Sequence, residues 1–191
     1  MSELAGLWIP IVVSAFALFV ANFVSRVMVR HHTSDCKELP EEESTVEHLQ
    51  KSGIGPGLYL FPGRLSKPSR DSEKSRQQRI NTGPWGTVNI WARQPSMGRN
   101  LLQSFTFYLI TNFFVAYLAA LALNPGAAFS LVFQVTGTAA ILAYAFGGIP
   151  NAIWLGSHLR AAVMDIVDGV CLGLITGVIF AMLWPASQLV D

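Results

Sequence analysis

The sequence predicts an all-α membrane protein with four transmembrane helices and a cytoplasmic loop of 70 residues, 31–100. Two runs without Asp, Glu, Lys or Arg carry this prediction: 60 residues between Arg99 and Arg160, and a second run from Gly169 to Val190. The composition agrees, because 51% of the residues are hydrophobic and only 13% are charged, whereas soluble domains contain about 25% charged residues.

The apolar runs have the lengths that a bilayer requires. About 20 apolar residues cross the hydrocarbon core, so Leu4–Ser25 crosses once, 101–149 crosses twice and Ala161–Trp184 crosses once. The expected organisation is a first transmembrane helix within 1–30, the cytoplasmic insertion, and a three-helix region at 101–191. A cleaved signal peptide is the less favoured interpretation of the first run, because it lacks a basic N-terminal region and is too long.

The distribution of basic residues predicts the orientation. Twelve of the 13 Lys and Arg residues lie between Arg26 and Arg99, and basic residues beside helix ends stay on the cytoplasmic side. We therefore expect the long loop inside the cell and both termini outside. Tryptophan favours the head-group level, and Trp8, Trp184 and Trp154 lie at the predicted ends of spans.

The loop contains several local patterns. Pro40 followed by three glutamates starts a helix, because proline suits the first turn and acids complement the positive end of the helix dipole; Gly53 ends it. The runs Gly57–Phe61 and Gly86–Trp91 are rich in aromatic and β-branched residues and predict a two-stranded ribbon. Residues 64–79 hold six basic and two acidic side chains with many Ser and Gln, which predicts a mobile segment.

Proline and glycine bound the remaining elements. The turn Asn124-Pro125-Gly126 joins two antiparallel helices, and residues 150–160 predict a short interfacial helix that begins at its proline. Helix four ends before Pro185. The expected bounds of the first three transmembrane helices are about Trp8–Met28, 101–123 and 127–148.

Helix four carries a ridge of small residues. Asp165, Gly169, Gly173, Gly177 and Ala181 recur every four residues, so they share one helix face. Small residues let another backbone approach closely, which is how transmembrane helices associate. We interpret the ridge as a packing face, with a solute pathway lined by glycine as the alternative. The pattern leaves open whether the neighbour belongs to this chain or to another copy.

Two carboxylates, Asp165 and Asp168, are neighbours on the surface of helix four. One interpretation is a proton or cation site, in which one carboxylate raises the pKa of the other through like-charge repulsion and desolvation. The favoured interpretation is structural: the pair binds Arg160, His158 or a polar residue of another helix and fixes the packing. The other spans carry no acidic residue, so a relay of several carboxylates is not supported.

Polar residues inside the other spans also need partners in hydrocarbon. Counted outward from their shared turn, Asn112 and Gln134 lie at similar depths, so we expect a hydrogen bond between their side chains. Such a bond contributes about 1 kcal/mol.

The segment that follows helix one contains metal-ligand residue types: His31, His32, Asp35 and Cys36. Zinc takes His, Cys and carboxylate ligands, but adjacent histidines seldom share one ion and the spacing matches no established site. A metal is therefore the minor alternative, and no cofactor is expected. The basic segment 64–79 attracts anionic lipid head groups; it lacks the interleaved aromatics that bind nucleic acid, so no nucleic-acid partner is expected.

Several short motifs give the chain a resemblance to a group of short, uncharacterised bacterial multi-pass membrane proteins. They are His31-His32-x-Ser34-Asp35, Pro56-Gly57-x-Tyr59-x-Phe61-Pro62, Ser96–Leu101, Gly137–Ala140 and Gly148-Ile149-Pro150-Asn151-x-Ile153-Trp154. The resemblance implies a bacterial inner-membrane location and supplies no activity.

Taken together, these patterns favour a structural or accessory component of a bacterial membrane complex, which binds the lipid bilayer and other membrane subunits or a second copy of itself. The competing class is a small proton- or cation-coupled transporter or channel that uses Asp165 and Asp168. A metal-dependent membrane enzyme is the third class. The chain shows none of the common catalytic signatures.

Overall fold

A computed structural model describes residues 6–29, 35, 37–63 and 70–186. The chain divides into two compact units: a helical unit formed by 1–36, 96–152 and 157–191, and a loop unit formed by 37–95 with 153–156. In chain order the elements are α2 (Trp8–Val24), the π-helix η1 (Ser25–Val29), α3 (Glu42–Lys51), β1 (Gly57–Phe61), α4 (Arg70–Thr82), β2 (Gly86–Ile90), α5 (Met97–Ala122), α6 (Phe129–Ile141), the π-helix η3 (Leu142–Phe146), α7 (Ile149–Leu155) and α8 (Leu159–Met182).

Three helical stretches in the described part of the chain are long and apolar enough to cross a membrane. They are Met97–Ala122, Phe129–Leu155 and Leu159–Met182, with mean hydropathies of 1.7, 1.6 and 2.0. The predicted second, third and fourth helices are confirmed to this extent. The first is shorter, because α2 has 17 residues; η1 continues it to Val29, close to the predicted end at Met28.

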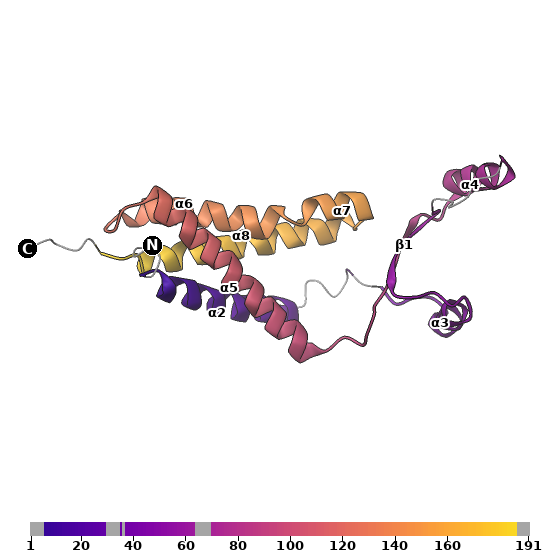
Figure 1. The fold of residues 1–191 in the computed structure, drawn as a ribbon, viewed down its shortest axis with the longest axis horizontal. Helices are drawn as coiled ribbons and strands as arrows, with labels where there is room; N and C mark the ends of the chain where they lie inside the picture. The colour runs from indigo at the N-terminus through magenta and orange to yellow at the C-terminus, as the bar shows by residue number, and fades with distance from the viewer. Residues whose placement is uncertain (1–5, 30–34, 36, 64–69, 187–191) are drawn as a thin grey trace, which may run out of the picture. The chain divides into compact units, whose positions relative to one another are not determined.

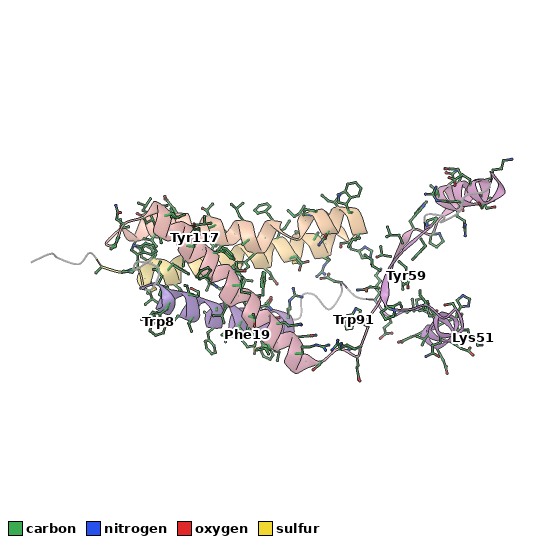
Figure 2. All side chains as sticks on the ribbon, viewed as in Figure 1. Trp8, Phe19, Lys51, Tyr59, Trp91 and Tyr117 are labelled. Carbon is green, nitrogen blue, oxygen red and sulfur yellow. The ribbon has the colours of Figure 1, made fainter. Side chains whose placement is uncertain are left out.

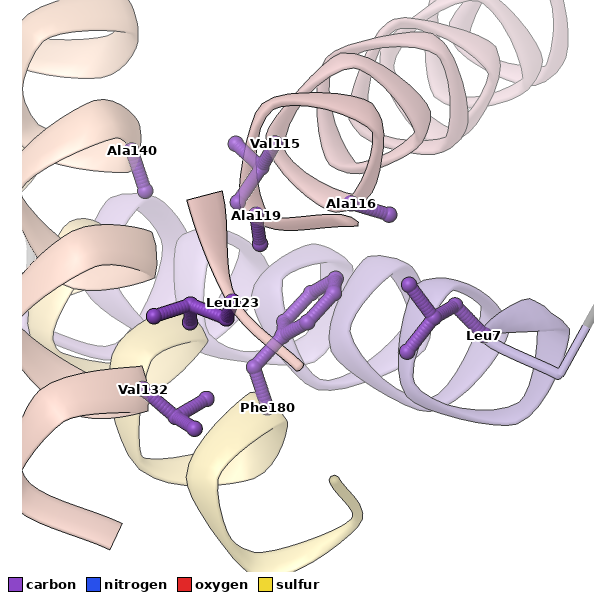
Figure 3. Packing of buried hydrophobic residues seen from close by; sticks show 8 residues of the cluster. All are labelled: Leu7, Val115, Ala116, Ala119, Leu123, Val132, Ala140 and Phe180. Carbon is purple, nitrogen blue, oxygen red and sulfur yellow. The ribbon is translucent and has the colours of Figure 1, made fainter. Parts of the chain in front are cut away.

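The helical unit is a bundle in which α8 packs along α6 and η3, α2 packs on α5 and α8, and α5 contacts α6. Figure 1 shows α6 and α8 side by side, with α5 crossing them obliquely. Small side chains let these helices approach closely. Phe180 fills the central space between them and is completely buried; Figure 3 shows its ring among Leu7, Val115, Ala116, Ala119, Leu123, Val132 and Ala140.

A second apolar cluster lies further along α2. It contains Ala15, Leu18, Tyr108 and Leu172. Beside it, the rings of Phe19 and Phe105 meet edge to face, with centroids 5.9 Å apart. The two clusters hold α2 against the rest of the bundle through side chains on one face.

The outside of the bundle is covered by large hydrophobic side chains. Soluble monomers seldom expose apolar surface on this scale, whereas lipid accommodates it. Trp8 and Tyr117 are two of these exposed residues (Figure 2). Others are Phe16, Phe107, Phe114, Leu121, Leu142 and Phe146.

One end of the bundle, which we call the turn end, is closed by the connection between α5 and α6. The predicted turn is present, and Gly126 adopts φ +79°, a conformation that favours glycine. Its amide N donates to the carbonyl O of Pro185 at 2.8 Å. The indole Nε1 of Trp184 donates to the carbonyl O of Asn124 at 3.0 Å, so the end of α8 holds the turn in place.

The loop unit contains the predicted ribbon. β1 and β2 pair antiparallel, with Gly57 opposite Ile90 and Phe61 opposite Gly86. A Cβ on Gly86 would lie 2.8 Å from Cζ of Phe61, so the phenyl ring lies on the glycine of the opposite strand. The predicted helix after Pro40 is present as α3, and Gly53 follows it with φ +65°.

The prediction of a mobile segment at 64–79 is wrong for its second part. Residues 64–69 lie outside the described residues, but 70–79 belong to α4. Arg, Lys, Gln and Glu have good helix propensity, and the salt bridge between Glu73 and Arg76 (3.1 Å) spans one helical turn. This helix has almost no apolar residue, so hydrophobic periodicity gave no signal.

Candidate functional site

The glycine ridge of α8 packs against α6 and η3 of the same chain. A Cβ on Gly169 would lie 2.5 Å from Cα of Ala145, and one on Gly177 would lie 3.0 Å from Cα of Gly137. A Cβ on Gly173 would lie 2.7 Å from the amide N of Ile141. These contacts are to main-chain atoms, so only glycine allows the two helices to come this close.

In this chain Gly169, Gly173 and Gly177 lie against α6 and η3 of the same molecule. At its first end the ridge also reaches a cavity, because Asp165 and Gly169 are among the residues that line it. Ala181, the last residue of the ridge, is partly buried against the cluster around Phe180. The first residue, Asp165, lies at the opposite end of the bundle, which we call the charged end.

A cavity of 240 Å³ opens at the charged end, between α2, η1, α5, η3, α7 and α8. Its apolar walls include Phe107, Ile166 and Leu172. Its polar lining consists of Asn22, Arg26, Tyr108, Tyr144, Asp165 and Asp168. Both carboxylates that the sequence singled out thus face one cavity, together with a guanidinium and two phenol groups.

The two carboxylates hold the end of the first helix. The hydroxyl of Ser25 donates to Oδ2 of Asp168 at 3.0 Å. The Nη2 atom of Arg26 lies 3.6 Å from Oδ1 of Asp165, and its Nε donates to Oδ1 of Asn22 at 3.2 Å. We expected the carboxylates to bind Arg160, His158 or a polar residue of another helix. Ser25 is such a polar residue.

Arg160, another expected partner of the carboxylates, forms a hydrogen-bonded salt bridge with Asp35. This pair ties the start of α8 to the segment that follows η1. Asp35 was a metal-ligand candidate. The other three candidates, His31, His32 and Cys36, lie outside the described residues, and within those residues no three His, Cys, Asp or Glu side chains form a group that suits a metal.

Three aromatic rings form one wall of the cavity. The centroid of the Phe107 ring lies 5.6 Å from that of Tyr108 and 6.0 Å from that of Tyr144. The two tyrosine rings meet edge to face at 5.8 Å. The sequence analysis missed this cluster, because residues 107 and 108 are separated from residue 144 by a turn and most of two helices.

Asn112 lies directly behind this wall, and its predicted hydrogen bond to Gln134 is wrong. The Nδ2 atom donates to the carbonyl O of Tyr108 at 2.9 Å and to the hydroxyl of Tyr144 at 3.2 Å. Both amide hydrogens are thus used, and the buried Oδ1 has no hydrogen-bond partner. The Tyr144 hydroxyl reaches Asn112 because α5 runs obliquely and the tyrosine side chain is long. Counting residues from the turn compares depth along the helices only, so it did not predict this contact.

Among the described residues, α2, α5, α6 and α8 each bury one polar side chain completely: Ser14, Asn112, Thr136 and Thr176. The two threonines donate to carbonyl groups of their own helices, at 2.7 Å for Thr136 and 3.0 Å for Thr176. The Ser14 hydroxyl has no partner. The interior of the bundle thus holds one polar side chain from each of these helices.

Comparison with protein-family models, with curated proteins and with solved structures gave no match to this chain. The function must therefore be argued from its own residues. Three features formed by these residues bear on function. They are an internally packed glycine ridge, a charged cavity with an aromatic wall, and a loop unit with a two-stranded ribbon.

Proposed function

We propose that this protein is a structural or accessory component of a bacterial inner-membrane complex. In this proposal four helices cross the membrane, both termini lie outside, and the loop unit lies in the cytoplasm. The observation that carries the proposal is the exposure of large apolar side chains on the ribbon. Such side chains are stabilised when a partner covers them.

The first strand of the ribbon places large apolar side chains on both faces. Leu58 and Leu60 extend from one face and Tyr59 and Phe61 from the other, because side chains alternate along a strand. Leu60 is 56% exposed, and the neighbouring Trp85 and Trp91 are 65% and 59% exposed. A two-stranded ribbon has marginal stability by itself, so contact with another subunit would stabilise it.

The test is purification in native nanodiscs followed by mass spectrometry of every protein that is present in stoichiometric amounts. We expect a defined membrane-protein partner, and we expect Leu58→Ser with Leu60→Ser to remove it. Val46→Ser, at an exposed apolar position of α3 in the same unit, is the matched control and retains the partner. A homo-oligomer with no other protein would contradict the accessory role.

A second function, proton or cation movement through Asp165 and Asp168, is favoured by the cavity that both carboxylates line. The assay is proton- or cation-dependent flux in vesicles that contain the full-length protein. Asp168→Asn retains an oxygen that accepts from Ser25, so we expect a folded protein without flux. Glu47→Gln in the loop unit is the matched control with normal flux. Normal flux in the Asp168 variant would exclude this role.

A further inference from the structure

The cavity at the charged end has the chemistry of an ammonium-binding site. Aromatic faces and carboxylates both attract ammonium groups, and here three rings stand beside two carboxylates. The volume of 240 Å³ equals roughly eight water molecules at about 30 Å³ each. The cavity therefore has room for a small organic group.

Arg26 restricts which cation fits. Its guanidinium lies 3.6 Å from the Asp165 carboxylate, which is longer than the roughly 2.7–2.9 Å of a tight charge-assisted bond. A bare metal ion at Asp165 would be repelled by this neighbouring positive charge. A group that carries an ammonium and a phosphate satisfies both signs, because the phosphate binds the guanidinium while the ammonium binds the carboxylate.

The depth of the cavity suits a lipid head group. Asp165 lies six residues after Leu159, the first residue of α8, or about 9 Å along the helix axis. The head-group layer on each side of a bilayer is about 5–8 Å thick. Asp165 thus lies close to the boundary between head groups and acyl chains, where a phospholipid places its charged groups. Asp168, nine residues after Leu159, lies about 13.5 Å along the axis, on the acyl-chain side of that boundary.

We propose that this cavity binds the phosphoethanolamine head group of a phospholipid. The primary ammonium donates hydrogen bonds to Asp165 and Asp168 and lies against the rings of Phe107, Tyr108 and Tyr144, while the phosphate contacts Arg26. A choline group is the poorer ligand, because its quaternary nitrogen has no hydrogen to donate. This inference holds whether the protein is an accessory subunit or a transporter.

Native mass spectrometry of the full-length protein tests the proposal. The protein is released from nanodiscs made of phosphatidylglycerol mixed with equal amounts of phosphatidylethanolamine and phosphatidylcholine, and the retained lipid is identified. We expect phosphatidylethanolamine to be enriched about tenfold over phosphatidylcholine, as expected when hydrogen bonds to a charged group are lost. Equal retention of these two lipids would overturn the proposal, since they differ only at the nitrogen.

Two variants locate the bound lipid. Asp165→Asn is expected to lower the enrichment about tenfold. Phe107→Leu is expected to lower the total amount of retained phosphatidylethanolamine about threefold by removing one ring, and it should fold normally because residue 107 is 52% exposed. Phe113→Leu, at an exposed position of the same helix outside the cavity, is the matched control. Unchanged enrichment in the Asp165 variant, together with unchanged retention in the Phe107 variant, would overturn the assignment to this cavity.

A separate arm distinguishes the lipid from a soluble amine. The protein in pure phosphatidylglycerol nanodiscs is mixed with free phosphoethanolamine and with ethanolamine. We expect neither compound to be retained. Stoichiometric retention of either one would overturn the lipid as the source of the ammonium group.

Discussion

Gly169→Ala tests the packing of α8 on η3 most directly. The new Cβ would lie 2.5 Å from Cα and 2.6 Å from N of Ala145. The closer of these distances is 0.9 Å short of the ordinary contact distance of 3.4 Å, and main-chain atoms cannot turn aside as a side chain can. Overpacking of this kind costs about 1–3 kcal/mol. Alanine returns about 0.5–1 kcal/mol through its higher helix propensity, so we expect a net loss of about 1 kcal/mol.

Gly137→Ala is the matched control on the facing helix. Its Cβ would meet Cα of Gly177 at 3.7 Å, an ordinary contact, so the helix-propensity gain remains and the variant is neutral or slightly more stable. Reversible unfolding in mixed micelles, followed by circular dichroism, measures the free energy of unfolding of both variants. A Gly169 variant as stable as the wild type, beside a destabilised Gly137 variant, would refute the packing argument.

Two further predictions concern polar pairs. Tyr144→Phe removes the hydroxyl that accepts from Asn112 and is expected to cost about 1 kcal/mol of unfolding free energy in the same assay, whereas Gln134→Ala has no comparable effect; the reverse order would contradict the assigned hydrogen bond. In a double-mutant cycle of Asp35→Ala and Arg160→Ala, the coupling energy is expected to be below about 1 kcal/mol and to fall as salt is added, because Arg160 is half exposed; a coupling that salt leaves unchanged would argue against this salt bridge.

The sequence predicted the elements of this fold better than the contacts between them. Helix bounds, the turn at Asn124–Gly126, the β ribbon and the small-residue ridge all depend on local composition and spacing, which can be read from a single chain. α4 was missed because its stability depends on charged and amide side chains rather than on apolar periodicity. Local patterns thus carry most of the secondary structure.

Long-range partners could not be read in the same way. The spacing placed Gly169, Gly173 and Gly177 on one face of the helix. Many different helices could pack against such a face, so the spacing did not identify the neighbour. Asn112 pairs with Tyr144 because α5 crosses α6 obliquely, and no local signal encodes that crossing. The sequence drew attention to the two carboxylates because a charged group in hydrocarbon costs free energy. The aromatic wall beside them could be recognised only in the folded structure, where residues from different helices come together.

The two ends of the bundle differ in how firmly they are held. At the turn end, hydrogen bonds from Gly126 to Pro185 and from Trp184 to Asn124 join three helices through main-chain carbonyls. At the charged end, the corresponding links run through the side chains of Ser25, Arg26 and Asp168, which rearrange more easily. The bonds at the turn end join α5, α6 and α8, whereas α2 is linked to α8 through these side chains at the charged end. A small tilt of α2 against α8 would therefore change the width of the cavity while the other three helices keep their arrangement.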